Sequence, residues 1–109
     1  MNTGTVQEGK TIAIISYITF IGTIIAYIMN QNKKNSFASF HIRQAVGIAI
    51  LGVAISILRN YMSLGIVGSI LSIGVLVLSI IGIISAVQGE EKRIPLLGDQ
   101  FQEWFKSIG

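Results

Sequence analysis

The stretch between Arg59 and Glu90 constrains this chain more than any other, because thirty consecutive residues there carry no charge. From Leu64 to Val87 it consists almost entirely of Ile, Leu, Val, Gly, Ala and Ser. As an α-helix this segment extends about 36 Å, enough to cross a hydrocarbon core of ~30 Å. Lipid offers the backbone no hydrogen-bond partner, so the β-branched content does not favour a strand. The stretch predicts a transmembrane helix over residues 64–88.

The composition of the whole chain agrees with a membrane protein. Of its 109 residues, 51% are hydrophobic and 12% are charged, whereas an average soluble domain has about 25% charged residues. The length allows one domain of a few helices. The absence of cysteine excludes disulfides and thiolate chemistry. A net charge of +3 is more typical of membrane orientation and headgroup contact than of nucleic-acid binding, and we expect no nucleic-acid partner.

Two further segments are apolar enough to cross a membrane. Residues 1–10 are polar and predict a short disordered or interfacial lead-in. Thr11 to Met29 are uncharged and predict a first span over 11–29. A cleaved signal peptide is the alternative, but the segment exceeds a usual apolar region and no small-x-small cleavage site follows. After a basic loop, Ser36 is a candidate N-cap for a second span over 37–60.

The tail after the third span is polar and amphipathic. Residues 90–109 begin with a charged linker and continue with Asp99 and Gln102, spaced as in a capping box. Apolar residues recur at helical spacing, with polar residues between them, at Leu97, Phe101, Trp104, Phe105 and Ile108. This pattern predicts a helix lying on the membrane surface through Phe101, Trp104 and Phe105. A helix packed on a soluble partner would give the same pattern.

These elements define an all-α fold: a transmembrane domain of three helices over residues 11–89, followed by a C-terminal amphipathic interfacial helix. With three spans, one side of the membrane holds six lysines and arginines and the other holds two, Lys10 and Arg59. The positive-inside rule then predicts a multi-pass protein of the bacterial inner membrane with its N-terminus outside and its C-terminus in the cytoplasm.

Small residues mark the faces through which these helices would pack. Helices in lipid associate mainly by close approach of small side chains. The third span has a stripe at spacings of three and four residues, interrupted only by Val75, at Gly65, Gly68, Ser72, Ser79, Gly82 and Ala86. The second span has a similar stripe at Ala45, Ala49, Gly52 and Ser56. The stripes predict a compact bundle. A partner protein could equally occupy them, and small residues are common in membrane helices generally.

The sequence contains no pattern that indicates catalysis. It has no nucleotide-binding loop, no metal-ligand spacing and no nucleophile–base arrangement, and its single histidine excludes a His-based metal site within one chain. We therefore expect no enzyme activity, no cofactor and no metal. The serines within the spans are interpreted as packing residues that bond their own helix carbonyls: Ser16, Ser56, Ser72, Ser79 and Ser85.

One dense polar cluster stands at the start of the second span, at Phe40, His41, Arg43 and Gln44. Positive charge at a helix start opposes the helix dipole, so these residues are not there to stabilise the helix. One interpretation is interfacial anchoring, with Arg43 on lipid phosphate. The other is a buried polar contact with the end of the last span or with a partner subunit, in which Glu90 or Glu91 would pair with the charge.

The same cluster carries a resemblance to a known family. Phe40-His41-x-Arg43-Gln44-Ala45, together with Gly89-x3-Arg93-Ile-Pro95 beyond the last span, resembles small polytopic bacterial proteins related to the Tic20-like, channel-associated subunit of the chloroplast import translocon. The resemblance implies a bundle of three or four spans with the cluster at a membrane boundary. This chain lacks a transit peptide and has about three spans, unlike the plastid members.

Three functional hypotheses follow. The first is a non-catalytic inner-membrane subunit of a larger assembly, with protein translocation, import or insertion as the candidate process. The second is a small homo-oligomeric channel or carrier with His41, Arg43 and Gln44 at its entrance. The third is a lipid-interacting protein that uses the Trp104 helix. The expected partners are accordingly the lipid bilayer and either other membrane subunits, such as a translocon, or further copies of the chain.

Overall fold

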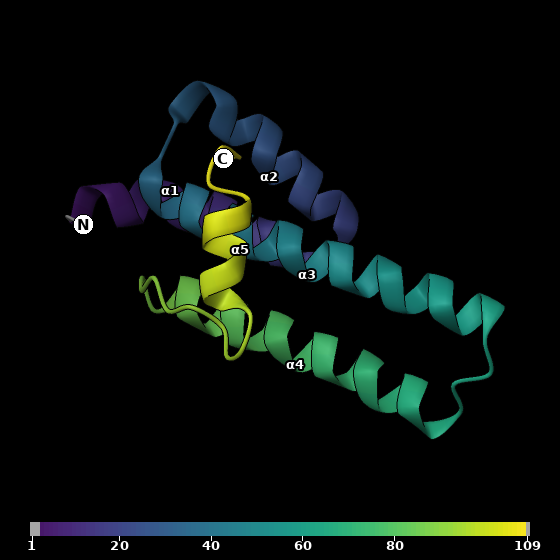
Figure 1. Cartoon of the computed structure of the whole chain (residues 1–109). Coiled ribbons are helices and arrows are strands. Elements are labelled where there is room, and N and C mark those ends of the chain that lie inside the picture. Colours follow the sequence, from purple (N-terminus) through teal and green to yellow (C-terminus); the bar gives the residue numbers. More distant parts are fainter. Residues whose placement is uncertain (1–2, 109) are drawn as a thin grey trace.

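The computed structural model describes residues 3–108, and their regular structure is entirely α-helical, as predicted. The long helices α3 (Ser36–Tyr61) and α4 (Ile66–Val87) form an antiparallel pair. The shorter helices α1 (Thr3–Ile18) and α2 (Phe20–Lys33) pack beside one half of that pair. The last helix, α5 (Gly98–Trp104), runs across the pair near the same end (Figure 1).

The predicted first span over residues 11–29 is wrong, because the chain reverses in its middle. Thr19 is extended, at φ −148° and ψ 173°, and separates α1 from α2. Its hydroxyl accepts from the Gly22 N–H at 3.0 Å and so caps α2. The two helices form an antiparallel hairpin (Figure 1). Within residues 3–108, two helices, α3 and α4, are long and apolar enough to span a membrane, rather than three.

The lead-in over residues 1–10 was predicted to be disordered or interfacial, and the disordered alternative is wrong from Thr3 onward, where α1 begins. This first part of α1 packs against the start of α3, where the Asn35 side chain lies directly over Gly9. The Asn35 amide also donates to the Thr5 carbonyl at 2.8 Å. Contact with the rest of the fold therefore makes this polar segment helical.

The turn between α2 and α3 is built from asparagine side chains. Lys34 ends α2 in the left-handed conformation, at φ 47°. The Asn30 carboxamide accepts from the Asn35 N–H at 2.9 Å and donates to Ser39 Oγ at 3.0 Å. Asn35 in turn caps α3 by accepting from the Ala38 N–H at 3.0 Å. The N-cap is thus Asn35, one residue before the predicted Ser36.

The core of the protein lies at one end of the long helices. Ten of the eleven buried residues of α3 precede Ala49, and only Ile55 follows it. Two clusters of buried apolar side chains fill this end: Ala13, Tyr17, Phe37, Ala45, Ile48, Ala86, Ile94 and Phe101 in one, and Ile12, Ala26, Ala38 and Ile42 in the other. Beyond the tip of the α1–α2 hairpin, α3 and α4 continue with each other as their only neighbours among the described helices.

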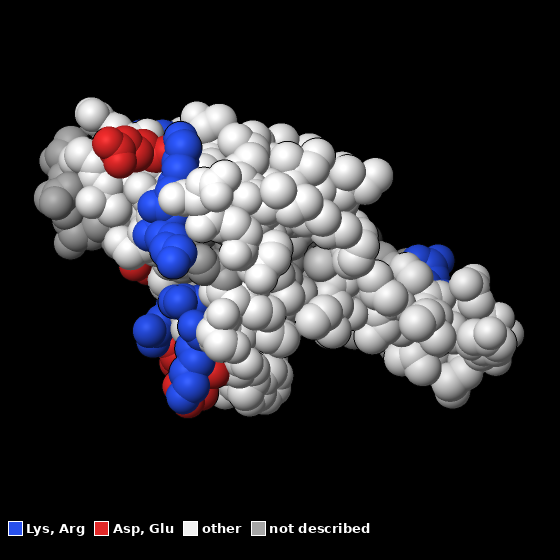
Figure 2. Space-filling view, turned by 90° about the horizontal axis from the view of Figure 1, so that it is seen from above, with Lys and Arg blue, Asp and Glu red and all other residues white. Residues whose placement is uncertain are grey.

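The charged residues other than Arg59 gather at the end that holds the core (Figure 2). Hydrogen bonds place the chain ends there too, because Thr5 bonds to the start of α3 and Arg43 bonds to the Ile108 carbonyl. The start of α1 and the last described residues therefore lie at the same end of the molecule. The predicted placement of the two termini on opposite sides required a third span, and with two spans it loses its basis.

Candidate functional site

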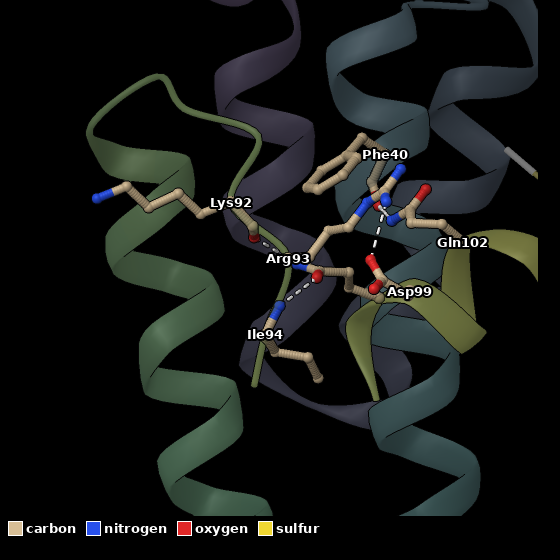
Figure 3. Close-up of polar contacts among 7 residues, drawn as sticks. Phe40, Lys92, Arg93, Ile94, Asp99 and Gln102 are labelled. Carbon is tan, nitrogen blue, oxygen red and sulfur yellow. Dashed lines mark hydrogen bonds and ion pairs between the residues drawn. The ribbon is translucent and has the colours of Figure 1, made fainter. Parts of the chain in front are cut away.

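Gln44 is the centre of a buried polar cluster at the start of α3. Its side chain is completely buried. Gln44 Oε1 accepts from the Ile94 N–H at 2.7 Å, and Nε2 lies 3.3 Å from the Lys92 carbonyl oxygen, to which it donates. The two backbone groups flank Arg93 on the extended segment that follows α4 (Figure 3). One amide side chain thus binds this segment through N–H and C=O together, as a neighbouring strand would.

His41 fixes the same segment one step earlier in the chain. Its Nε2 lies 2.8 Å from the Glu90 carbonyl, and its Nδ1 lies 2.7 Å from the Tyr17 hydroxyl. Because a carbonyl can only accept, Nε2 carries the hydrogen and Nδ1 accepts from the tyrosine. The Tyr17 oxygen then accepts from Gln44 Nε2 at 2.9 Å. The result is a continuous chain of bonds from α1 through α3 to the segment after α4.

Aromatic rings enclose His41 on three sides. Tyr17, Phe37 and Phe40 meet the imidazole edge to face, with ring centroids 5.5, 4.8 and 5.1 Å away. His41 is therefore completely buried and does not reach a lipid headgroup. The Glu90 carboxylate pairs with Lys92 at 3.1 Å and not with His41, which uses only the Glu90 backbone.

Two further residues of the cluster were not expected from the sequence. Ser85 Oγ donates to the Glu90 carbonyl at 2.9 Å and accepts from the Lys92 N–H at 3.1 Å. It therefore bonds the following segment, not its own helix as predicted. Gln102 of α5 is buried and donates to the Phe40 carbonyl at 2.8 Å (Figure 3). Its position in an amphipathic pattern had placed it among the polar, outward residues.

We call Tyr17, His41, Gln44 and Ser85, with the segment 90–94 that they hold, the polar clamp. Within residues 3–108, every buried side-chain nitrogen or oxygen has a hydrogen-bond partner. A fully bonded cluster of this kind fixes one docking geometry, because any other would leave buried polar groups unpaired. Its chemistry is structural, since each of these polar groups is used within the chain.

Arg43 lies at the edge of the clamp and is half-buried. It donates through Nε to the Ile108 carbonyl and through Nη2 to the Lys106 carbonyl, both at 3.0 Å. The guanidinium therefore binds carbonyl oxygens near the end of the chain. It holds the segment after α5 against α3.

The small residues of the predicted stripes lie in three kinds of surroundings: packed within the chain, exposed before α4, or lining a groove. Gly82 lies directly against the Tyr17 ring, Ala86 is completely buried, and Gly68 packs on the Arg59 side chain. Ser72 accepts from Arg59 Nη1 at 2.9 Å. Gly65 is exposed and has a positive φ of 58° just before α4. The remaining small residues line an open groove below the hairpin tip, together with Val75: Ala45, Ala49, Gly52, Ser56 and Ser79. The groove has a volume of about 410 Å³.

The predicted surface helix divides its aromatic residues between the bundle and the exterior. Phe101 is buried, with its ring directly over Gly47 of α3. Phe105 is half-buried beside it, at a centroid distance of 6.2 Å. Trp104 is 65% exposed. Of the three, Trp104 is the side chain most available to a membrane or a partner.

A comparison with protein families matches residues 8–101 to the MamF/MmsF model, described as the magnetosome magnetite crystal formation protein family. The chain belongs to the MamF/MmsF family. The match includes both long helices and the whole polar clamp. Membership in this magnetosome family and two helices of spanning length agree that this is a membrane protein. No curated protein and no solved structure matched the chain.

This assignment corrects the Tic20-like resemblance, which was wrong. The resemblance rested on the cluster around His41 and on Gly89-x3-Arg93-Ile-Pro95. In this MamF/MmsF chain the two patterns meet as the two halves of the polar clamp. Both patterns therefore hold the segment after α4 against α3. This is a packing role, and it does not indicate a translocon.

Proposed function

We propose that this MamF/MmsF protein is a non-catalytic membrane subunit that assembles with other proteins of the magnetosome membrane and so supports magnetite crystal formation. The observation that carries the proposal is the groove between the hairpin tip, α3 and α4. Its lining includes the small residues Ala45, Ala49, Gly52, Ser56 and Ser79, and large apolar side chains beside them, such as Phe20, Val53 and Ile57, are 45–55% exposed. In lipid, burial of apolar surface contributes little free energy to association. Helices therefore associate mainly at surfaces of small residues, which allow close approach. A ridge of side chains from a partner helix would fit it.

The distribution of charge supports an indirect role in mineral formation. Iron in its common oxidation states favours oxygen and nitrogen ligands, carboxylates among them. All five acidic side chains of the chain lie in the first half of α1 or after α4, at the end that holds the core: Glu8, Glu90, Glu91, Asp99 and Glu103. Residues 3–108 contain no group of three His, Asp or Glu side chains that could hold a metal ion. The protein would act through its partners.

The same distribution favours one orientation. Seven of the eight basic residues lie at the end that holds the core, and only Arg59, in the last turn of α3, lies toward the other. By the positive-inside rule, the core end with both chain ends faces the cytoplasm. Because the chain has no cysteine, single-cysteine variants can test this. A membrane-impermeant thiol reagent applied to the non-cytoplasmic side should label S63C and spare K34C, and labelling of K34C alone would reverse the orientation.

The assembly role is tested by blocking the groove. Ala49 is half-buried and lines the groove, whereas Ala54 lies on the same helix, is exposed and lies outside it. Ala49→Leu should abolish recovery of partner proteins from gently solubilised membranes, and Ala54→Leu should leave it unchanged. Equal recovery with both variants would contradict the groove as the contact, and a wild-type protein that always purifies as a lone monomer would contradict the assembly role.

The other two functional hypotheses differ in their support. A channel entrance at His41 and Gln44 has no support, because both side chains are completely buried and bonded within the chain. A role in protein translocation has none either, since it rested on the corrected resemblance. The third hypothesis, interaction with lipid, applies to any membrane protein. The shape of the chain supports one particular kind of lipid interaction, which involves the α1–α2 hairpin.

A further inference from the structure

The α1–α2 hairpin reaches only part of the way across a membrane. Its apolar section begins after Lys10, and the reversal comes at Thr19. The eight residues from Thr11 to Ile18 extend only about 12 Å, less than half of a ~30 Å hydrocarbon core. The α2 arm returns toward Lys33, at the same end of the molecule.

The hairpin is built to lie in lipid. Large side chains near its tip and along α2 face outward, with exposed fractions of 55–68% at Ile18, Phe20, Ile21 and Ile28. A reversal at this depth must satisfy its own backbone groups. The Thr23 hydroxyl donates to the Ser16 carbonyl at 2.7 Å and lies 3.1 Å from the Thr19 carbonyl, while Thr19 Oγ1 caps Gly22. The two threonine hydroxyls thus replace part of the backbone hydrogen bonding that a continuous helix would provide.

The hairpin gives the protein a tapered outline. At the core end, four helices lie together and α5 crosses them, whereas past the hairpin tip α3 and α4 continue as a pair (Figure 1). The space-filling view shows the same contrast between a broad end that holds most of the charged residues and a narrow extension on which Arg59 is the charged residue (Figure 2). In α3, residues Val53, Ala54, Ile57 and Leu58 are exposed on this extension. One leaflet therefore accommodates a larger protein cross-section than the other.

We propose that the protein is a curvature-selective wedge, which binds preferentially to bilayers in which the leaflet at the core end is convex. In a curved bilayer the headgroups of the convex leaflet are spread apart, and insertion of a partial-depth element into that leaflet relieves the packing defect. Interfacial helices respond to curvature for the same reason. The ligand is the curved lipid surface itself, so the proposal does not depend on any protein partner.

The test uses purified protein carrying the single cysteine K34C, reconstituted in vesicles of phosphatidylcholine and phosphatidylglycerol extruded to a small and a large diameter. When small and large vesicles are formed in the presence of the same pool of protein, we expect about twofold or more protein per lipid in the small ones. We also expect a larger fraction of K34C to be labelled from outside in the small vesicles, because the core end then occupies the convex leaflet. Equal density and equal labelling at both sizes would overturn the proposal.

A pair of variants assigns the effect to the hairpin. Ile21→Asn makes the lipid-facing tip polar, and Tyr61→Asn changes an 84% exposed side chain at the narrow end. Size preference should fall with Ile21→Asn and persist with Tyr61→Asn; equal loss in both would overturn the role of the hairpin. If Ile21→Asn fails to insert, the wild-type size series still decides whether the protein senses curvature. A fluorophore attached to the cysteine of I21C then tests the tip: bromolipids should quench its fluorescence, and the absence of quenching would overturn a membrane-inserted hairpin.

Discussion

Different interactions stabilise the two ends of the pair formed by α3 and α4. At the core end, most residues of the first half of α3 are buried, and its polar side chains bond α1, the segment after α4 and the segment after α5. At the narrow end, the second half of α3 and the start of α4 are mostly exposed and apolar, with Arg59 and Ser72 supplying a polar contact between them. Hydrogen bonds therefore determine the geometry of the core end, whereas the packing of the narrow end depends on the lipid or protein around it.

This difference follows from what a bilayer provides. Apolar surface gains little by leaving lipid for a protein interior, so apolar residues alone do not select one arrangement of helices. A buried amide or imidazole does, because an unpaired group costs about 1–3 kcal/mol. The polar clamp therefore makes the core end unique in geometry, while the narrow end can adapt to lipid or to a partner helix.

The largest expected effect comes from removing the amide of the clamp. Gln44→Leu would leave the Ile94 N–H without its acceptor and the Lys92 carbonyl and Tyr17 hydroxyl without their donor. We expect the free energy of unfolding to fall by about 2–4 kcal/mol, measured by thermal unfolding in detergent micelles. Hydrogen exchange should rise most in residues 90–105. The matched control is Gln100→Leu, because Gln100 is exposed; an equal loss there would show that the clamp is not the cause.

The sequence predicted the long helices and the broad fold class, and missed the hairpin for a local reason. An uncharged run predicted α4 within a few residues, and α3 was predicted from a mainly apolar segment with Arg43 and Arg59 near its ends, because length and hydropathy decide a span. Residues 11–29 also met the criterion of length and hydropathy, yet a single extended residue, Thr19, divides them into two helices. Thr19, Gly22 and Thr23 carry the local signal, a cap followed by a glycine that lies directly against the Ile15 carbonyl. Threonine is common in membrane helices, so this signal is weak without the tertiary contacts of α1.

The site was predictable in part. The dense polar cluster singled out His41 and Gln44, because buried polar groups in a membrane need partners. Their partners are mostly backbone groups of residues 90–94, and a sequence pattern does not reveal which backbone groups meet a side chain. Ser85 and Gln102 were missed because serine in an apolar helix and glutamine in an amphipathic one look ordinary.

A close approach at the core end should be much less tolerant than an open position at the narrow end. A Cβ at Gly82 would meet the Tyr17 ring, whereas a Cβ at Gly74 has open space around it. Gly82→Ala should lower the free energy of unfolding by about 1–3 kcal/mol through overpacking. Gly74→Ala should leave it unchanged or raise it by up to about 1 kcal/mol, because alanine favours the helix. Comparable losses in thermal stability for both variants would contradict the contrast between the ends.

The reversal at Thr19 offers a test of intermediate size. Thr19→Val keeps the shape of the side chain but removes the hydroxyl that accepts from the Gly22 N–H. Loss of an N-cap costs about 1 kcal/mol, and hydrogen exchange should accelerate at Gly22 and its neighbours before any change at α4. Thr11→Val, at an exposed position within α1, is the control. Exchange that accelerates equally throughout α1 and α4 would indicate global loosening, not loss of a cap.

The smallest effect is expected for the ion pair that closes the loop between the clamp and α5. Arg93 Nη1 lies 2.8 Å from Asp99 Oδ1, but both side chains are more than half exposed (Figure 3). Water and salt screen such a pair, so Asp99→Asn should change the free energy of unfolding by less than about 1 kcal/mol, and by less still at high salt. The clamp residues beneath it are bonded through backbone groups that this change does not touch. A loss as large as that of Gln44→Leu would mean that surface charge, not buried hydrogen bonding, holds the segment in place.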